Sequence, residues 1–290
     1  MLLVAPRTRL VQGRADGGHS WEMAVRLPSD HLRPYVHGDY CGYVERTARP
    51  LRRRELATPF VVFVLEFGPP IRIYDYGSTT SASRHAGGFV AGMDDRFALT
   101  EHDGFQSGVQ VNLTPIGARL FFGLPMSELA GQVVSSRDLL PRRHRSLAER
   151  LEPLPDWDAR FDLVEEVLSE GLARAQVDTS VVAWAVQRIE ESGGAVDMRA
   201  LARDLGYSPK HVIRLFHDQV GMPPKRLARI VRFTRLARHL RKGGAGTWAE
   251  LALDFGYYDQ AHLVREVKRF TGVTPTQARP LLADFYGLEA

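Results

Sequence analysis

The feature that most constrains the fold of this chain is a passage that occurs twice near its C-terminal end. The first copy is LARDLGYSPKHVIRLF at 201–216, and the second is LALDFGYYDQAHLVREV at 251–267. The Leu-Ala, Asp and Gly-Tyr positions of the first copy recur fifty residues later, and after the Gly-Tyr pair the offset becomes fifty-one. The sequence therefore predicts two copies of one structural device, with one residue inserted in the second.

Residue types in the first copy predict two short helices separated by a tight turn. Asp197 is a helix-capping residue, and Gly206 suits the left-handed conformation that ends a helix. Ser208 and Pro209 then begin a second helix, because proline at the first helical position loses only an N–H that would be unpaired anyway. This arrangement over about 197–220 predicts a helix-turn-helix, whose second helix enters the major groove of DNA.

The second copy repeats this pattern with different residues. Thr247 and Glu250 have the spacing of a capping box, Gly256 turns the chain, and Asp259 can cap the following helix. We therefore expect a second helix-turn-helix over about 247–270.

Between the two copies lies the basic segment KRLARIVRFTRLARHLRK, residues 225–242, with eight Lys or Arg and no acid. As one helix it spans roughly 27 Å, comparable to the roughly 34 Å between successive major-groove faces of DNA. Over 199–242 twelve basic residues face only two acids. This excess is typical of a surface that binds a polyanion, although a solvated helical face is the alternative.

These motifs together resemble the AraC/XylS family of bacterial transcription regulators. The resemblance is carried by LA-x-D-x-GYS-x-x-x-V-x-R-x-F at 201–216, by LA-x-D-x-GY-x-DQAHL-x-R-x-V-K at 251–268, and by G-x-TP-x-x-x-R at 272–279. It implies a helical DNA-binding module with two helix-turn-helix units. The positions that read bases in the family correspond here to Lys210, Ile213, Arg214, Gln260, His262 and Arg265.

The side chains at these positions decide which bases each could read. Arg bonds guanine and Gln bonds adenine in bidentate fashion. Ile213 stands where the family often has a polar residue, and it could read only a thymine methyl or nothing. Contacts to DNA phosphates are expected from the basic segment and the recognition helices, at Ser208, Arg229, Arg232 and Lys268.

The N-terminal part predicts strands at 60–68, 71–77, 87–93 and 108–113, because apolar runs and alternating patterns there are bounded by Gly and Pro. Ser127 is a candidate cap for a helix over the sequence ELAGQVV that follows it.

The expected fold class is α+β: a β-rich N-terminal domain followed by an all-α C-terminal domain in which a long helix joins the two helix-turn-helix units. The expected boundaries are 1–140 for a sensing or oligomerisation domain, 141–178 for a helical linker, and 179–290 for the DNA-binding domain.

Other protein classes receive little support. The single Cys41 excludes an intramolecular disulfide, and no apolar run is long enough for a membrane helix. A cytoplasmic location without a membrane partner fits best. We expect no catalytic residues, no cofactor and no metal site, since no nucleophile elbow or His-x-His cluster is present. The alternative is an enzyme with an N-terminal catalytic domain and an accessory DNA-binding module.

The leading interpretation is therefore a sequence-specific DNA-binding transcription regulator. Its expected partner is double-stranded promoter or operator DNA; RNA polymerase, a small-molecule effector and a second copy in a homodimer are candidate partners. The ligand-binding residues are unknown, and the polar candidates, for which surface or structural roles are favoured, are Arg72, His85, Arg96 and His102.

Overall fold

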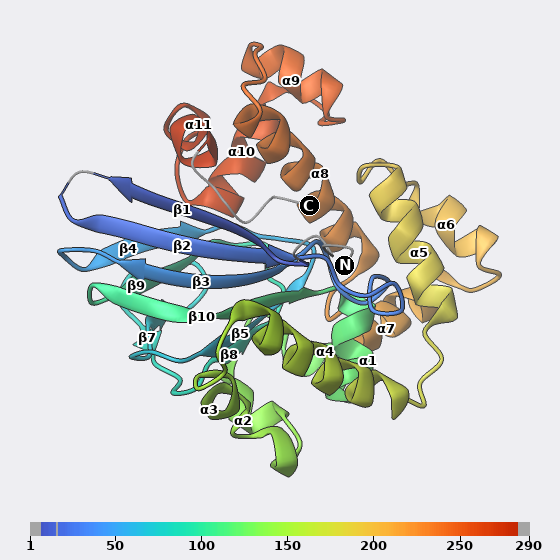
Figure 1. Cartoon of the computed structure of the whole chain (residues 1–290). Coiled ribbons are helices and arrows are strands. Elements are labelled where there is room, and N and C mark those ends of the chain that lie inside the picture. Colours follow the sequence, from blue (N-terminus) through green and yellow to red (C-terminus); the bar gives the residue numbers. More distant parts are fainter. Residues whose placement is uncertain (1–6, 16, 284–290) are drawn as a thin grey trace, which may run out of the picture.

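The computed structural model describes residues 7–15 and 17–283. The outer ends of the expected terminal domains, residues 1–6 and 284–290, lie outside this range. In the described part, strands fill the N-terminal half and helices fill the C-terminal half (Figure 1). The α+β fold class is thus confirmed.

The larger of the two sheets contains seven described strands, all joined to their neighbours in antiparallel fashion. In spatial order they are β1 (Arg9–Ala15), β2 (His19–Arg26), β3 (Tyr40–Arg46), β10 (Phe105–Leu113), β5 (Val61–Glu66), β8 (Phe89–Ala91) and β11 (Val133–Ser135). The strands expected at 60–68 and 108–113 are confirmed as β5 and β10, which pair with Val111 opposite Phe63. Val111 is fully buried because alternate residues of β10 face the core.

A second, four-stranded sheet lies beside the first. Its described strands are β4 (Leu51–Glu55), β9 (Ala98–His102), β6 (Arg72–Tyr74) and β7 (Ala82–Ser83). The loop between β8 and β9 contains Asp94 and Asp95, two buried acids that reappear below.

Short helices close the N-terminal half. They are α1 (Pro115–Phe122), α2 (Ser136–Leu139) and α3 (Leu147–Leu151), with 3₁₀ turns η1 (Met126–Glu128) and η2 (Arg142–His144). The helix expected after Ser127 is wrong: Gly131 takes a left-handed φ of 70°, and the chain then returns to the sheet as β11. Val134 pairs with Val90 there, and such β-branched residues favour strands.

The long helix α4 (Trp157–Ala173) begins at Asp156, whose carboxylate accepts a hydrogen bond from the Ala159 N–H at 2.8 Å. It packs against α1 and the large sheet. The Trp157 ring lies directly on Gly42, where any side chain would overlap it. This helix therefore packs within the chain.

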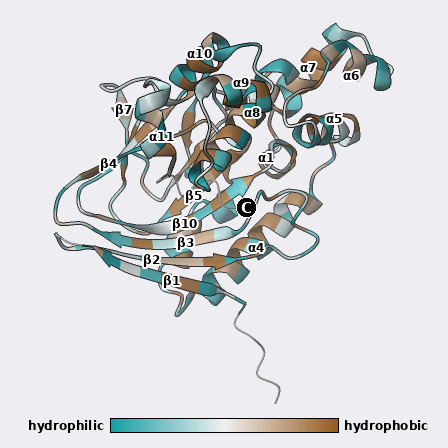
Figure 2. Cartoon of the chain, turned by 90° about the horizontal axis from the view of Figure 1, so that it is seen from above, coloured by the Kyte–Doolittle hydropathy of each residue, from teal (hydrophilic) through white to brown (hydrophobic). Residues whose placement is uncertain are grey.

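The C-terminal helices are α5 (Ser180–Glu191), α6 (Met198–Asp204), α7 (Pro209–Gln219), α8 (Pro224–Arg241), α9 (Trp248–Asp254), α10 (Gln260–Thr271) and α11 (Pro275–Ala283). Seen from above, the helices α5 to α11 lie on one side of the molecule and β1 and β2 on the other (Figure 2). No helix in the described ranges is long and apolar enough to cross a membrane.

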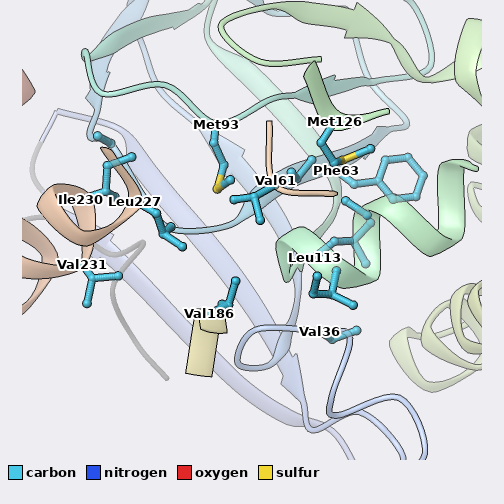
Figure 3. Packing of buried hydrophobic residues seen from close by; sticks show 14 of the residues in the cluster. Val36, Val61, Phe63, Met93, Leu113, Met126, Val186, Leu227, Ile230 and Val231 are labelled. Carbon is cyan, nitrogen blue, oxygen red and sulfur yellow. The ribbon is translucent and has the colours of Figure 1, made fainter. Parts of the chain in front are cut away.

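One apolar core joins the two halves. Figure 3 shows Leu227 and Ile230 of α8 near Met93 and Val61 of the β-rich half. All four residues are buried in one cluster. The helical half is therefore packed onto the sheets rather than tethered to them.

Candidate nucleic-acid interface

The first helix-turn-helix consists of α6, a turn at Gly206, and α7. The Asp197 carboxylate accepts a hydrogen bond from the Arg199 N–H at 2.8 Å and so caps α6. Gly206 has a φ of +71°, which an L side chain would resist. The Ser208 hydroxyl accepts from the His211 N–H at 3.3 Å and caps α7. The caps and the turn expected from the sequence are thus present.

The second unit consists of α9, a turn at Gly256, and α10. Thr247 and Glu250 form the expected capping box. Gly256 has a φ of +72°, close to the value at Gly206. The Asp259 carboxylate accepts from the His262 N–H at 2.6 Å.

The helix α8 joins the two units and begins and ends within one residue of its expected bounds. Its apolar residues are buried among the neighbouring helices, and the Phe233 ring stacks on Phe270 of α10 at 4.5 Å between ring centroids. A rigid connection between the units follows from this packing.

On α7, the three residues expected to read bases lie on the outer side. Lys210, Ile213 and Arg214 are exposed, with 43% of Ile213 accessible. An Arg214 guanidinium N–H lies 3.2 Å from the His211 ring nitrogen. The inner residue Phe216 is completely buried. The helix thus presents one polar face to solvent.

On α10, Gln260 and Arg265 are exposed, whereas His262 is half-buried. The His262 ring meets Tyr257 edge-on at 5.5 Å and accepts a hydrogen bond from the Tyr258 N–H at 3.3 Å. The His262 ring therefore has a local structural role in addition to its predicted contact with bases.

The predicted phosphate contacts differ in availability. The Ser208 hydroxyl is occupied as a cap, and Lys268 is exposed. Arg229 donates to Glu266 at 2.8 Å and lies 3.5 Å from Asp95. Arg232 donates to the Gly194 carbonyl at 2.8 Å. Contacts of these two arginines with phosphate remain predictions, and each would require exchange of an existing partner.

The acidic pair Asp94 and Asp95, which contacts the DNA-binding half, was not predicted from the sequence. Asp95 is fully buried and accepts hydrogen bonds from Arg226 at 2.6 Å and from Arg269 at 2.8 Å. Burial raises the pKa of Asp95, but the hydrogen bonds from Arg269 and Arg226 outweigh it and lower the pKa below its ordinary value. The sequence signal was two adjacent acids, followed by Arg96, in the short segment between two apolar runs.

The four polar candidates for a ligand pocket do not converge. Arg72 pairs with Glu101, His85 hydrogen-bonds Ser83, and His102 is buried within 3.4 Å of Glu45. A separate loop holds Arg96, which forms two hydrogen bonds with Asp94.

Two family models match parts of the chain. Residues 201–280 match a helix-turn-helix domain, and residues 25–135 match a domain of unknown function, DUF6597. No curated protein matches the chain.

Several solved structures are similar. ToxT from Vibrio cholerae is 10% identical, with 83% of this chain and 98% of that chain covered and a TM-score of 0.47. Another ToxT structure, with an unsaturated fatty acid bound, has the same identity, coverage and TM-score. The C-terminal domain of AraT, a response regulator from Geobacillus stearothermophilus, is 24% identical, with 35% of this chain and 84% of that chain covered and a TM-score of 0.33.

The matched range 201–280 contains both recognition helices and α8, so the geometry and the family model agree on a tandem helix-turn-helix DNA-binding region. This region is an AraC-type helix-turn-helix domain. The resemblance seen in the sequence is confirmed for this region.

Proposed function

We propose that the protein regulates transcription by reading a specific DNA sequence with α7 and α10, under control of its N-terminal half. The observation that carries this proposal is the outer face of each recognition helix. Lys210 and Arg214 on α7, and Gln260 and Arg265 on α10, are exposed while the opposite faces are buried. Such faces fit the major groove.

The roles of individual residues follow from their chemistry. Arg214 and Arg265 would bond guanine, Gln260 would bond adenine, and Lys210 and His262 would reach base edges beside them. Ile213 would contact a thymine methyl. Ser208, Arg229, Arg232 and Lys268 would hold phosphates, which supply affinity rather than sequence preference.

We assign control of DNA binding to the N-terminal half, acting through a small molecule or through dimerisation, because the apolar core of this half is continuous with α8. We propose the domain division 1–140, 141–178 and 179–290, a cytoplasmic location where promoter DNA is available, and RNA polymerase as a partner at the promoter. The proposal contains no catalytic step.

The test is selection of genomic fragments by the purified full-length protein at moderate salt, followed by sequencing of the retained DNA. We expect a motif with two half-elements about one helical turn apart, and loss of that motif when Arg214→Ala and Arg265→Ala are combined. Arg145→Ala is the matched control, since Arg145 is exposed near α3 and has no ion-pair partner in the described ranges. Retention without any motif would refute base reading.

A further inference from the structure

An open cleft of about 560 Å³ lies where the β8–β9 loop meets the start of α8 and the end of α10. Its walls come from both halves of the molecule. The side chains that carry charge there are Asp95, Arg96, Lys225, Arg226, Arg229 and Arg269. Pro223 is the one apolar residue that lines it. Six of the seven residues that line the cleft thus carry a charge.

The charges in this cleft do not balance. Five cations line it, and three carboxylates pair with them: Asp94, Asp95 and Glu266. Five minus three leaves a surplus of two positive charges. Lys225 makes no ion pair within residues 7–15 and 17–283, so its ammonium group is available.

Unused hydrogen-bond donors also lie at the cleft. The Arg226 Nε is buried without an acceptor in the described structure. The first turn of α8, unlike those of α7 and α10, has no side chain that caps it. Pro223 and Pro224 carry no N–H there, and the Arg226 N–H donates to the Pro223 carbonyl at 2.9 Å, so it is the positive end of the helix dipole that favours an anion at this turn.

From this geometry we propose that the cleft binds a compact, doubly charged anion, a phosphate monoester or a short dicarboxylate. Two negative charges match the surplus of two, and the exposed Lys225 supplies an ammonium group without an ion-pair partner in the described ranges. The volume is sufficient for a small metabolite. A single carboxylate, with or without an alkyl tail, leaves one of the two surplus charges unmatched.

The cleft lies between the two halves of the molecule, so a bound anion would contact both. Arg96 and Asp95 belong to the N-terminal half, whereas Lys225, Arg226 and Arg269 belong to the helices of the DNA-binding half. An anion held by both halves strengthens the contact between them. Its role as the effector rests on the proposed function above, but the binding itself does not.

The test compares probes at constant ionic strength on the full-length protein. Inorganic phosphate and malonate are the dianions, acetate is the monoanion, and decanoate carries an alkyl tail. We expect both dianions to raise Tm by preferential binding to the folded state. Acetate, decanoate and additional sodium chloride should not raise it.

Two lysine variants then locate the site. Lys225→Gln removes the unpaired cation and should weaken dianion binding about tenfold, as loss of one charge-assisted hydrogen bond does. Lys242→Gln removes an exposed lysine at the other end of α8 and should leave binding unchanged. Equal dianion binding by wild-type protein and Lys225→Gln would overturn the site, as would equal effects of acetate and phosphate.

DNA affinity measured on the same samples separates the two proposals. If Lys225→Gln weakens DNA binding but wild-type protein binds no dianion, the cleft serves DNA phosphate and the proposed ligand is wrong. Dianion binding that leaves the affinity for the selected motif unchanged would overturn the effector role while upholding the site. Failure of fragment selection would refute only the proposed function.

Discussion

The two helix-turn-helix units follow one sequence plan, yet they contact the N-terminal half through different chemistry. In the first unit, α7 packs against η1 and α1, and Gly221 lies on the backbone of Met126. In the second unit, Arg269 bonds Asp95, and the Thr271 carbonyl accepts from Arg54 at 2.5 Å. The first contact is mainly steric, with one ion pair between Arg119 of α1 and Asp218 of α7 at 3.2 Å, and the second is mainly polar.

The difference extends to equivalent positions inside the units. Leu215 of α7 corresponds to Glu266 of α10, which is buried and pairs with Arg229. A repeat thus preserves the caps and turns that form the helices, while side chains that meet the rest of the molecule diverge. Substitutions at equivalent positions of the two units therefore should differ in their effect on stability.

The largest expected effect concerns the centre of each unit. Phe216 and its equivalent Val267 are both completely buried. Phe216→Ala should destabilise the protein by about 3–5 kcal/mol, because it removes a large ring and leaves a cavity. Val267→Ala removes two methyl groups and should cost about half as much. Urea unfolding of the full chain measures both, and equal losses would contradict a larger core in the first unit.

The next prediction uses the equivalent glycines Gly221 and Gly272, whose φ values are +86° and +72°. Alanine at either position is strained by about 1–2 kcal/mol. A Cβ at Gly221 would also lie 2.7 Å from the Met126 carbonyl oxygen, which is backbone, whereas at Gly272 it meets the side chains of Phe97 and Arg54. Gly221→Ala should therefore cost about 1–3 kcal/mol more than Gly272→Ala.

Urea unfolding of the two alanine variants provides the measurement. A larger loss in Gly272→Ala would mean that the polar contact of the second unit is the more rigid one. That result would reverse the comparison.

The same contrast explains what the sequence could predict. Caps and turns depend on residues a few positions apart, so Ser208, Asp259, Gly206 and Gly256 revealed both units correctly. The helix expected after Ser127 failed because pairing between β11 and β8 outweighed a local capping signal.

The contact of Asp95 with Arg226 and Arg269 joins residues more than 130 positions apart. No local pattern encodes such a pairing, and from the sequence alone the basic residues of α8 were predicted to contact DNA. The structure shows that part of this charge is neutralised within the chain.

The third prediction tests the polar contact. Asp95→Asn should destabilise the protein by about 1–3 kcal/mol, a range kept low because Arg226 and Arg269 are partly exposed to solvent. The lowered pKa of Asp95 determines how its contribution to the free energy of unfolding depends on pH. Its stabilisation is fully present above the ordinary carboxyl pKa of about 4 and is lost as the pH falls through the lowered value.

Urea unfolding of wild-type protein and Asp95→Asn at pH 7 and below pH 4 checks this sign. The difference between the two proteins should shrink in acid. A difference that grows as the pH falls would show that the carboxylate is not the stabilising form.

The smallest expected effect separates the two caps. Ser208→Ala and Asp259→Ala should each cost about 0.5–2 kcal/mol, with the larger loss for Asp259, because its carboxylate also interacts with the positive end of the α10 dipole.

The effects of these two substitutions on DNA affinity should differ in direction. Ser208 is a neutral predicted phosphate contact, so its loss should weaken DNA binding, whereas removal of the Asp259 charge reduces repulsion of phosphate and should strengthen it. Salt titrations of both variants on the selected motif measure this, and parallel changes would indicate that the two recognition helices meet the DNA backbone in the same way.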